Sequence, residues 1–313
     1  MNKIAKHAFG KAFSPEWFFH IWRTSVYLCV LLTADSLSAR NADAAQETKN
    51  EALLKRAVAA YAGGKRNEAI VLATQAIEAE PNEARSYLVR AQLYSEGQQP
   101  AKAIVDYDTV LKLEPELANA WQHRGEEHFK LGQVKESLAD FDKFIALVPG
   151  RAAYLWQRGI TCYYAGRFEE GRKQFELHRT VNPNDVENAV WHFLCVAQLA
   201  GLEQARAGLI PIKGDSRVPM MEIYALFGGK AKPEDVLKAA RAANEQPGRA
   251  MFYAHLYLGL YAEANGEMAQ AREHIAKAAA EYRTDDYMGD VARVHLLLRA
   301  PGEKPVSGET KVH

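Results

Sequence analysis

The sequence predicts an all-α solenoid, a stack of helical hairpins of equal length, and three observations predict it. Prolines recur at one constant spacing at four places: Pro81, Pro115, Pro149 and Pro183. Glycines recur in step with them at nearly the same spacing: Gly64, Gly97, Gly132, Gly166 and Gly201. Alternating β-branched and polar residues, the pattern typical of strands, are absent. A fixed period of this size is typical of repeat architectures, in which each unit buries the apolar side of its neighbour.

Each marker has its own physical role in a hairpin. A glycine after the first helix permits the left-handed backbone that ends that helix. A proline after the second helix lacks the N–H that a continuing helix would donate, so the helix ends there. The proline spacing is the period of the tetratricopeptide repeat, and the third unit, AWQHRGEEHFKLGQVKESLADFDKFIALVP, shows its pattern best. We therefore expect four tandem repeats over residues 50–185.

A recurring arginine in these repeats allows two interpretations. It stands at Arg90, Arg124 and Arg158, and sixteen residues later come Asp106, Asp140 and Gln174. The arginines could form a basic stripe for an acidic ligand. Alternatively, each could pair across its own hairpin, by an ion pair in the first two cases and a hydrogen bond in the third. We favour pairing within the repeat, because this spacing places the two side chains opposite each other on antiparallel helices.

After Pro183 the repeat pattern weakens and later returns. Residues 186–248 form a divergent helical segment, since Pro211 and Pro219 interrupt the second helix that should follow. Residues 249–298 are expected to form another hairpin of the same type, followed by a helix that caps the stack. The polar residues 299–313 are predicted to be a disordered tail.

The N-terminal segment has the order of a secretory signal peptide. A basic region precedes the apolar run VYLCVLLTA, and Ala42-Asp43-Ala44 supplies small residues for cleavage after Ala44. The run is shorter than the roughly 20 residues that span a bilayer. We therefore expect residues 1–44 to be removed and the mature protein to be periplasmic or secreted; an uncleaved membrane anchor is the alternative.

The composition and motifs favour a binding protein over an enzyme. The 39 basic and 39 acidic residues balance, which gives no electrostatic reason to expect a nucleic-acid partner. Sequence motifs for nucleotide, metal or nucleophilic sites are missing, so we predict no catalytic residue, no metal site and no cofactor. Cys162 and Cys195 are expected to be buried free thiols. The remote alternative is a hydrolase that uses Glu222 or Asp235 in the irregular segment.

A concave face lined by the first helix of each repeat is the predicted binding surface. Counting from the repeat start assigns these residues to it: Leu88, Gln92, Gln122, Glu126, Phe129, Trp156, Ile160, Tyr163 and Tyr164. Aromatic residues are enriched at binding hot spots, and Trp156 and Tyr163 are the preferred anchors for a partner peptide or protein. The competing interpretation is that some of these aromatics only pack against neighbouring hairpins. The lysine and asparagine pattern that grips a C-terminal carboxylate in chaperone-binding repeats is missing.

The order of segments resembles that of the NlpI-type periplasmic tetratricopeptide lipoproteins. The residues that carry the resemblance are PMMEIYALFGGKAKPEDVLKAA after a departure from the repeat, then FYAHLYLGLYAEANGEMAQAREHIAKAA and a final helix. The resemblance implies an often dimeric adaptor that docks cell-wall hydrolases and a periplasmic protease. Val26-Tyr27-Leu28 before Cys29 lacks the small residue that lipidation requires, which is a departure from that family. A scaffold for secretion or outer-membrane assembly is the alternative.

Overall fold

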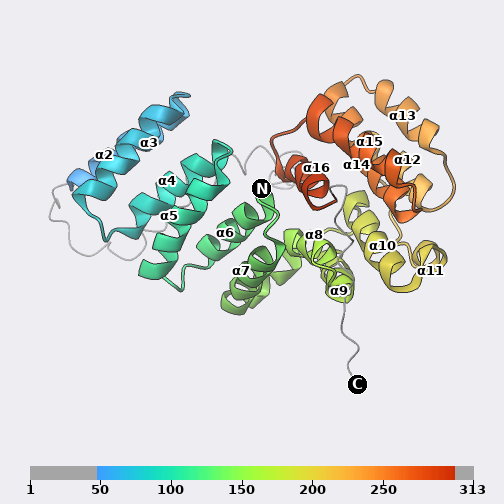
Figure 1. The fold of residues 1–313 in the computed structure, drawn as a ribbon, viewed down its shortest axis with the longest axis horizontal. Helices are drawn as coiled ribbons and strands as arrows, with labels where there is room; N and C mark the ends of the chain where they lie inside the picture. Colours follow the sequence, from blue (N-terminus) through green and yellow to red (C-terminus); the bar gives the residue numbers. More distant parts are fainter. Residues whose placement is uncertain (1–47, 300–313) are drawn as a thin grey trace, which may run out of the picture. The chain divides into compact units, whose positions relative to one another are not determined.

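The computed structural model describes residues 48–299, and within this range it contains helices and turns but no strand (Figure 1). The predictions for the signal segment and for the tail from residue 300 onward lie outside the described residues. From Lys49 onward the described chain belongs to one compact unit. The all-α class predicted from the repeat period is confirmed.

Four hairpins follow one another at the N-terminal end of this unit. Their helices are α2 (Lys49–Ala62) and α3 (Arg66–Ala79), α4 (Ala84–Glu96) and α5 (Pro100–Leu113), α6 (Ala118–Lys130) and α7 (Val134–Leu147), and α8 (Trp156–Tyr164) and α9 (Phe168–His178). A 3₁₀ turn, Pro149–Tyr154, lies between α7 and α8. Each helix packs on its hairpin partner, and the second helix of each hairpin packs on the helix that follows it.

The turn glycines behave as predicted at three of the four hairpins. Gly64, Gly132 and Gly166 have φ values of 76°, 71° and 72°, a backbone region that residues with a Cβ rarely adopt. The second hairpin differs, since Gly97 has φ −85° and the left-handed residue is Gln98, with φ 53°. A small residue is also needed between paired helices: a Cβ on Gly159 would lie 2.6 Å from the Phe175 ring.

The recurring arginines pair with the predicted residue of their own repeat in two of the three cases. Arg90 and Arg124 form ion pairs with Asp106 and Asp140 at 2.8 and 2.7 Å, as predicted. The hydrogen bond predicted between Arg158 and Gln174 is wrong.

Arg158 instead contacts two carboxylates, Asp142 at 2.6 Å and Glu170 at 3.1 Å, while Gln174 donates to the Ala152 carbonyl. A guanidinium bonds more strongly to a carboxylate than to a neutral amide. Glu170 lies on α9 of the same hairpin and Asp142 lies in the preceding repeat, so this arginine pairs across its own hairpin and also joins two hairpins.

The rest of the chain departs from the repeat and then resumes a hairpin. The helices are α10 (Val186–Ala200), α11 (Leu202–Ala207), α12 (Met220–Phe227), α13 (Pro233–Arg241), α14 (Pro247–Ala264), α15 (Met268–Ala276) and α16 (Tyr287–Leu298). Helices α14 and α15 form a hairpin, and α16 packs on α15. The largest apolar core runs from the third repeat through α16.

Helix α16 does more than cap the last hairpin, because it also returns to the third repeat. It contacts α6, and Figure 1 shows it beside α6 and α8. The Tyr287 ring stacks on Phe129 with centroids 5.2 Å apart and meets the edge of Trp156 at 5.1 Å. These contacts join residues that lie far apart in the sequence.

Candidate functional site

The predicted concave-face residues form rows across successive first helices. The constant repeat period puts equivalent side chains next to one another: Leu88, Gln122 and Trp156 in one row, Gln92, Glu126 and Ile160 in a second, and Phe129 and Tyr163 in a third. Polar residues occupy the second and third repeats, and large apolar residues occupy the fourth. The face therefore changes character along the stack.

The aromatic part of this face is covered by the chain itself. Phe129, Ile160, Tyr163 and Tyr164 are at most 3 % exposed. Helix α16 contacts Phe129 through Tyr287 and Tyr164 through His295, whereas Tyr163 packs against Phe168 of α9 and Trp191 of α10. For these four side chains the structure shows the packing that we considered as the competing interpretation, in place of an open groove. Trp156 is half-buried against Tyr287.

His295 of α16 carries a polar contact into this apolar block. Its Nδ1 lies 3.1 Å from the Tyr164 hydroxyl, and its Nε2 lies 3.6 Å from Glu263. Burial lowers the pKa of His295 to about 4, although the Glu263 carboxylate acts in the opposite direction and the Arg299 guanidinium adds to the lowering. The buried imidazole is therefore neutral at neutral pH.

Acid should destabilise the fold through this histidine. The unfolded chain takes up a proton near pH 6.5, whereas folded His295 does so only near pH 4. Stability is thus fully present above pH 6.5 and falls as the pH drops toward 4. Urea unfolding at pH 6.5 to 4.5 should show the wild type losing about 1.4 kcal/mol more per pH unit than His295→Asn. If the unfolding free energies of the wild type and His295→Asn depend equally on pH, Glu263 stabilises the imidazolium of His295 in the folded state.

The second and third repeats leave part of the concave face accessible. Leu88, Gln92 and Glu126 are half-buried, whereas Gln122 is 8 % exposed. Helix α16 packs on α6, which carries Gln122 and Glu126, and its contact with α4, which carries Leu88 and Gln92, is weaker. Candidate contacts for a partner are therefore confined to this stretch and the adjoining edge of Trp156.

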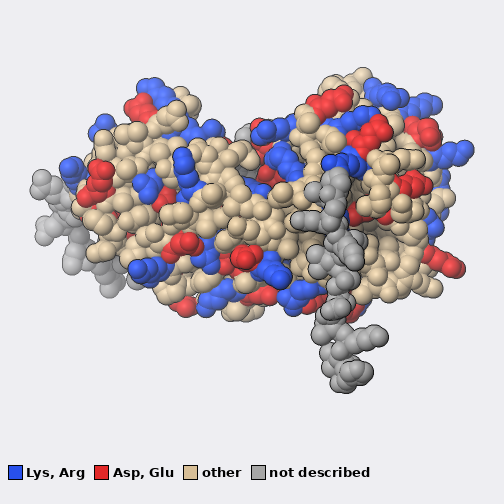
Figure 2. Space-filling view, viewed as in Figure 1, with Lys and Arg blue, Asp and Glu red and all other residues tan. Residues whose placement is uncertain are grey.

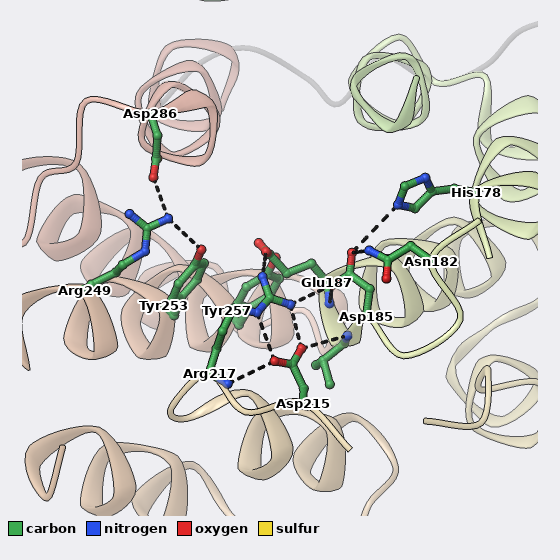
Figure 3. A network of polar contacts seen from close by, with 11 residues as sticks. His178, Asn182, Asp185, Glu187, Asp215, Arg217, Arg249, Tyr253, Tyr257 and Asp286 are labelled. Atoms are coloured by element: carbon green, nitrogen blue, oxygen red, sulfur yellow. Dashed lines mark hydrogen bonds and ion pairs between the residues drawn. The ribbon is translucent and has the colours of Figure 1, made fainter. Parts of the chain in front are cut away.

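A second polar site, which we did not predict, lies where the repeat pattern breaks (Figure 3). The Arg217 guanidinium contacts three carboxylates: Asp185 at 2.7 Å, Asp215 at 2.6 Å, and Glu187. The Tyr257 hydroxyl donates to Glu187 at 2.7 Å. These contacts tie the segment that contains Pro211 and Pro219 to α10 and α14.

Burial and charge act against each other in this network. Burial raises the pKa of Glu187, the Arg217 charge lowers it, and the Asp185 charge raises it again. Burial lowers the pKa of Arg217, but the three carboxylates outweigh burial and raise it. All three carboxylates share one cationic partner, the Arg217 guanidinium. The network is therefore suited to holding segments of the chain together.

The network continues to the start of α16 through α14. Arg249 contacts Asp286 at 2.8 Å and the Tyr253 hydroxyl at 3.1 Å (Figure 3). Asp286 is the N-cap of α16 and accepts a hydrogen bond from the Gly289 N–H at 3.0 Å. The same region that stabilises the irregular segment therefore also fixes the helix that covers the aromatic block.

The side chains considered for chemistry lie in the following surroundings. Residues 48–299 contain no group of histidine, cysteine and acidic side chains that could hold a metal ion. Cys162 and Cys195 are free and buried, as predicted, and burial raises the pKa of the Cys162 thiol to about 11. Of the residues considered for a hydrolase, Asp235 accepts from the Lys232 N–H at the start of α13, a capping role.

The outer surface mixes both charges. On the face shown in Figure 2, basic and acidic side chains are interspersed over the repeats, which agrees with the balanced composition. Among the helices of residues 48–299, none has the length and apolar character that crossing a membrane requires.

Comparisons with known proteins agree with this architecture. Residues 54–121 match the family profile described as the tetratricopeptide repeat. A tetratricopeptide repeat protein from Parabacteroides merdae is 15 % identical, with a TM-score of 0.52 over 80 % of this chain and 98 % of that one. MamA from Desulfovibrio magneticus is 17 % identical, with a TM-score of 0.48 over 52 % of this chain and 92 % of that one. No curated protein sequence matches.

A peptide-bound domain is also among the similar structures. The first tetratricopeptide repeat domain of Spaghetti, solved with an HSP90 peptide, is 26 % identical with a TM-score of 0.32, over 32 % of this chain and 80 % of that one. The match of residues 54–121 and the shared fold define the fold class: the described chain is a solenoid of stacked helical hairpins, with tetratricopeptide repeats matched over residues 54–121. Proteins of this class mediate interactions with other proteins.

Proposed function

We propose that this chain is an exported, non-enzymatic adaptor of the cell envelope that binds partner proteins through the accessible concave face of its second and third repeats. The observation that supports this proposal is the difference in exposure along the face. Leu88, Gln92 and Glu126 stay partly accessible, whereas Ile160, Tyr163 and Tyr164 of the fourth repeat are buried. The basic and apolar N-terminal segment supports export.

The partner class follows from the resemblance to the NlpI-type proteins. It supports docking of peptidoglycan hydrolases and a periplasmic protease, and it extends the proposal to a homodimer. Light scattering of the purified chain tests the dimer. The tetratricopeptide match of residues 54–121 supports an interaction role.

Affinity capture from envelope extracts, with mass spectrometry of the bound proteins, tests the proposal. We expect a cell-wall hydrolase or a protease in the bound fraction of the full chain. Leu88→Ala should reduce capture about tenfold, the size of loss seen when a hot-spot side chain is truncated. Val105→Ala is the matched control, because Val105 is 63 % exposed and lies on α5, the second helix of the same repeat.

The outcomes separate the candidates. Capture of neither a hydrolase nor a protease discards that partner class, and capture of secretion or outer-membrane assembly proteins would favour the alternative scaffold. Equal losses with Leu88→Ala and Val105→Ala would remove the concave face from the proposal.

A further inference from the structure

Glu126 is a carboxylate on the accessible concave face that contacts no lysine or arginine among residues 48–299. Its side chain is 15 % exposed, and its one ion-pair contact in this range is His123, whose Nδ1 lies 3.3 Å from Oε2. Two neutral amides orient it: Gln122 Nε2 donates to Oε1 at 3.1 Å and Gln157 Nε2 at 3.4 Å. Neutral donors fix the position of the carboxylate and add no positive charge. Its positive neighbours are the His123 imidazole and, beyond ion-pair distance, the Lys130 ammonium.

A buried acceptor beside Glu126 also lacks a partner. Gln157 is 5 % exposed, and its Oε1 atom accepts no hydrogen bond. A buried acceptor without a donor is costly in a folded protein. The cluster therefore presents a partly exposed carboxylate, beside an enclosed amide oxygen that has no donor among residues 48–299.

The pKa of the neighbouring His123 indicates that a positively charged donor is favoured here. Burial alone would lower the pKa of His123, yet its pKa is raised, because the hydrogen bond and charge of Glu126 outweigh burial. A positive charge is thus stabilised at this position. The half-buried ring of Trp156 adjoins the cluster from the next repeat, and aromatic faces attract cations.

We propose that this cluster, Gln122, His123, Glu126 and Gln157, binds a lysine or arginine side chain of a partner segment. Apolar residues on either side of that basic residue would pack on Leu88 and on the accessible edge of Trp156. This inference rests on the proposed use of the concave face, and it adds the chemistry of the ligand. The recognition is opposite in sign to that of repeats that grip a carboxylate.

Panning of a phage-displayed library of random 12-residue peptides against the full chain tests the proposal. Enriched peptides should share a lysine or arginine between apolar residues. In fluorescence polarisation, replacing that residue by alanine should weaken binding to the wild type about tenfold or more, as for close charge pairs at interfaces. The same replacement should have little further effect on Glu126→Gln, which keeps the shape and removes the charge. Glu116→Gln, in the exposed turn before α6, is the matched control and should behave as the wild type.

Every other outcome overturns this inference. Enriched peptides without a basic residue, or basic peptides that bind wild type and Glu126→Gln equally, would leave the proposed function in place and remove the cation site. If no peptide is enriched while envelope proteins are still captured in a Leu88-dependent manner, the partner is recognised through a folded surface and not by a basic segment. Thermal melting of each variant, monitored by circular dichroism, keeps loss of fold separate from loss of binding.

Discussion

Replacing Tyr163 by alanine should destabilise the fold by about 4 kcal/mol, the cost typical of deleting a buried aromatic side chain. Tyr163 is 1 % exposed and lies in edge contact with the rings of Tyr164, Phe168 and Trp191, at centroid distances of 5.4, 5.7 and 5.5 Å. Removing it leaves a cavity that these rings cannot fill, because they belong to separate helices. Urea unfolding followed by circular dichroism at 222 nm measures the loss.

The control for this experiment is Tyr154→Ala in the 3₁₀ turn. Tyr154 is 56 % exposed, so its removal should change stability by less than about 0.5 kcal/mol. The opposite pattern, in which Tyr163→Ala keeps wild-type stability and loses partner binding, would show that Tyr163 serves binding and not packing. The experiment thus decides between packing and binding for a residue that we first assigned to the groove.

The contrast between Tyr163 and Gln92 shows what periodicity can and cannot predict. The repeat period places both on the concave side of a first helix, and it also predicts the pairs of Arg90 and Arg124 with their aspartates. It cannot predict that α16 returns to the third and fourth repeats, because the contact of Phe129 with Tyr287 joins positions with no common period. Burial of Phe129 and Tyr164 depends in part on that long-range contact surface.

The polar clusters around Glu126 and Arg217 also differ in whether sequence spacing predicts their contacts. Gln122 and Glu126 stand one helical turn apart on α6, so their contact follows from local geometry. The partners of Arg217 come from a segment outside the repeat, and its carboxylates lie up to 32 residues away. One member of this cluster could have been found from the sequence. Asp185 accepts a hydrogen bond from the Glu187 N–H at the start of α10, and an aspartate before a helix is recognisable as an N-cap.

Arg217→Met should be the most damaging change of a charged residue, at about 3 kcal/mol, because it leaves several buried carboxylates without their cation. Asp215, Glu187 and Asp185 have side chains that are only 5, 15 and 16 % exposed. Without the guanidinium, these groups repel one another and take up protons. The free energy of unfolding at pH 7, from urea titration, measures the loss.

Two further variants test whether charge is the cause. Arg172→Met is the matched control, because Arg172 is 29 % exposed, close to the 26 % of Arg217, but its partners Glu169 and Glu176 are 49 and 45 % exposed. Water screens such partners, so this variant should lose much less stability. Adding Glu187→Gln to Arg217→Met should recover part of the loss, since it removes one unpaired charge and keeps an acceptor for the Tyr257 hydroxyl. If the double variant is as unstable as the sum of the two single variants, the loss comes from packing of the Arg217 side chain and not from the uncompensated carboxylates.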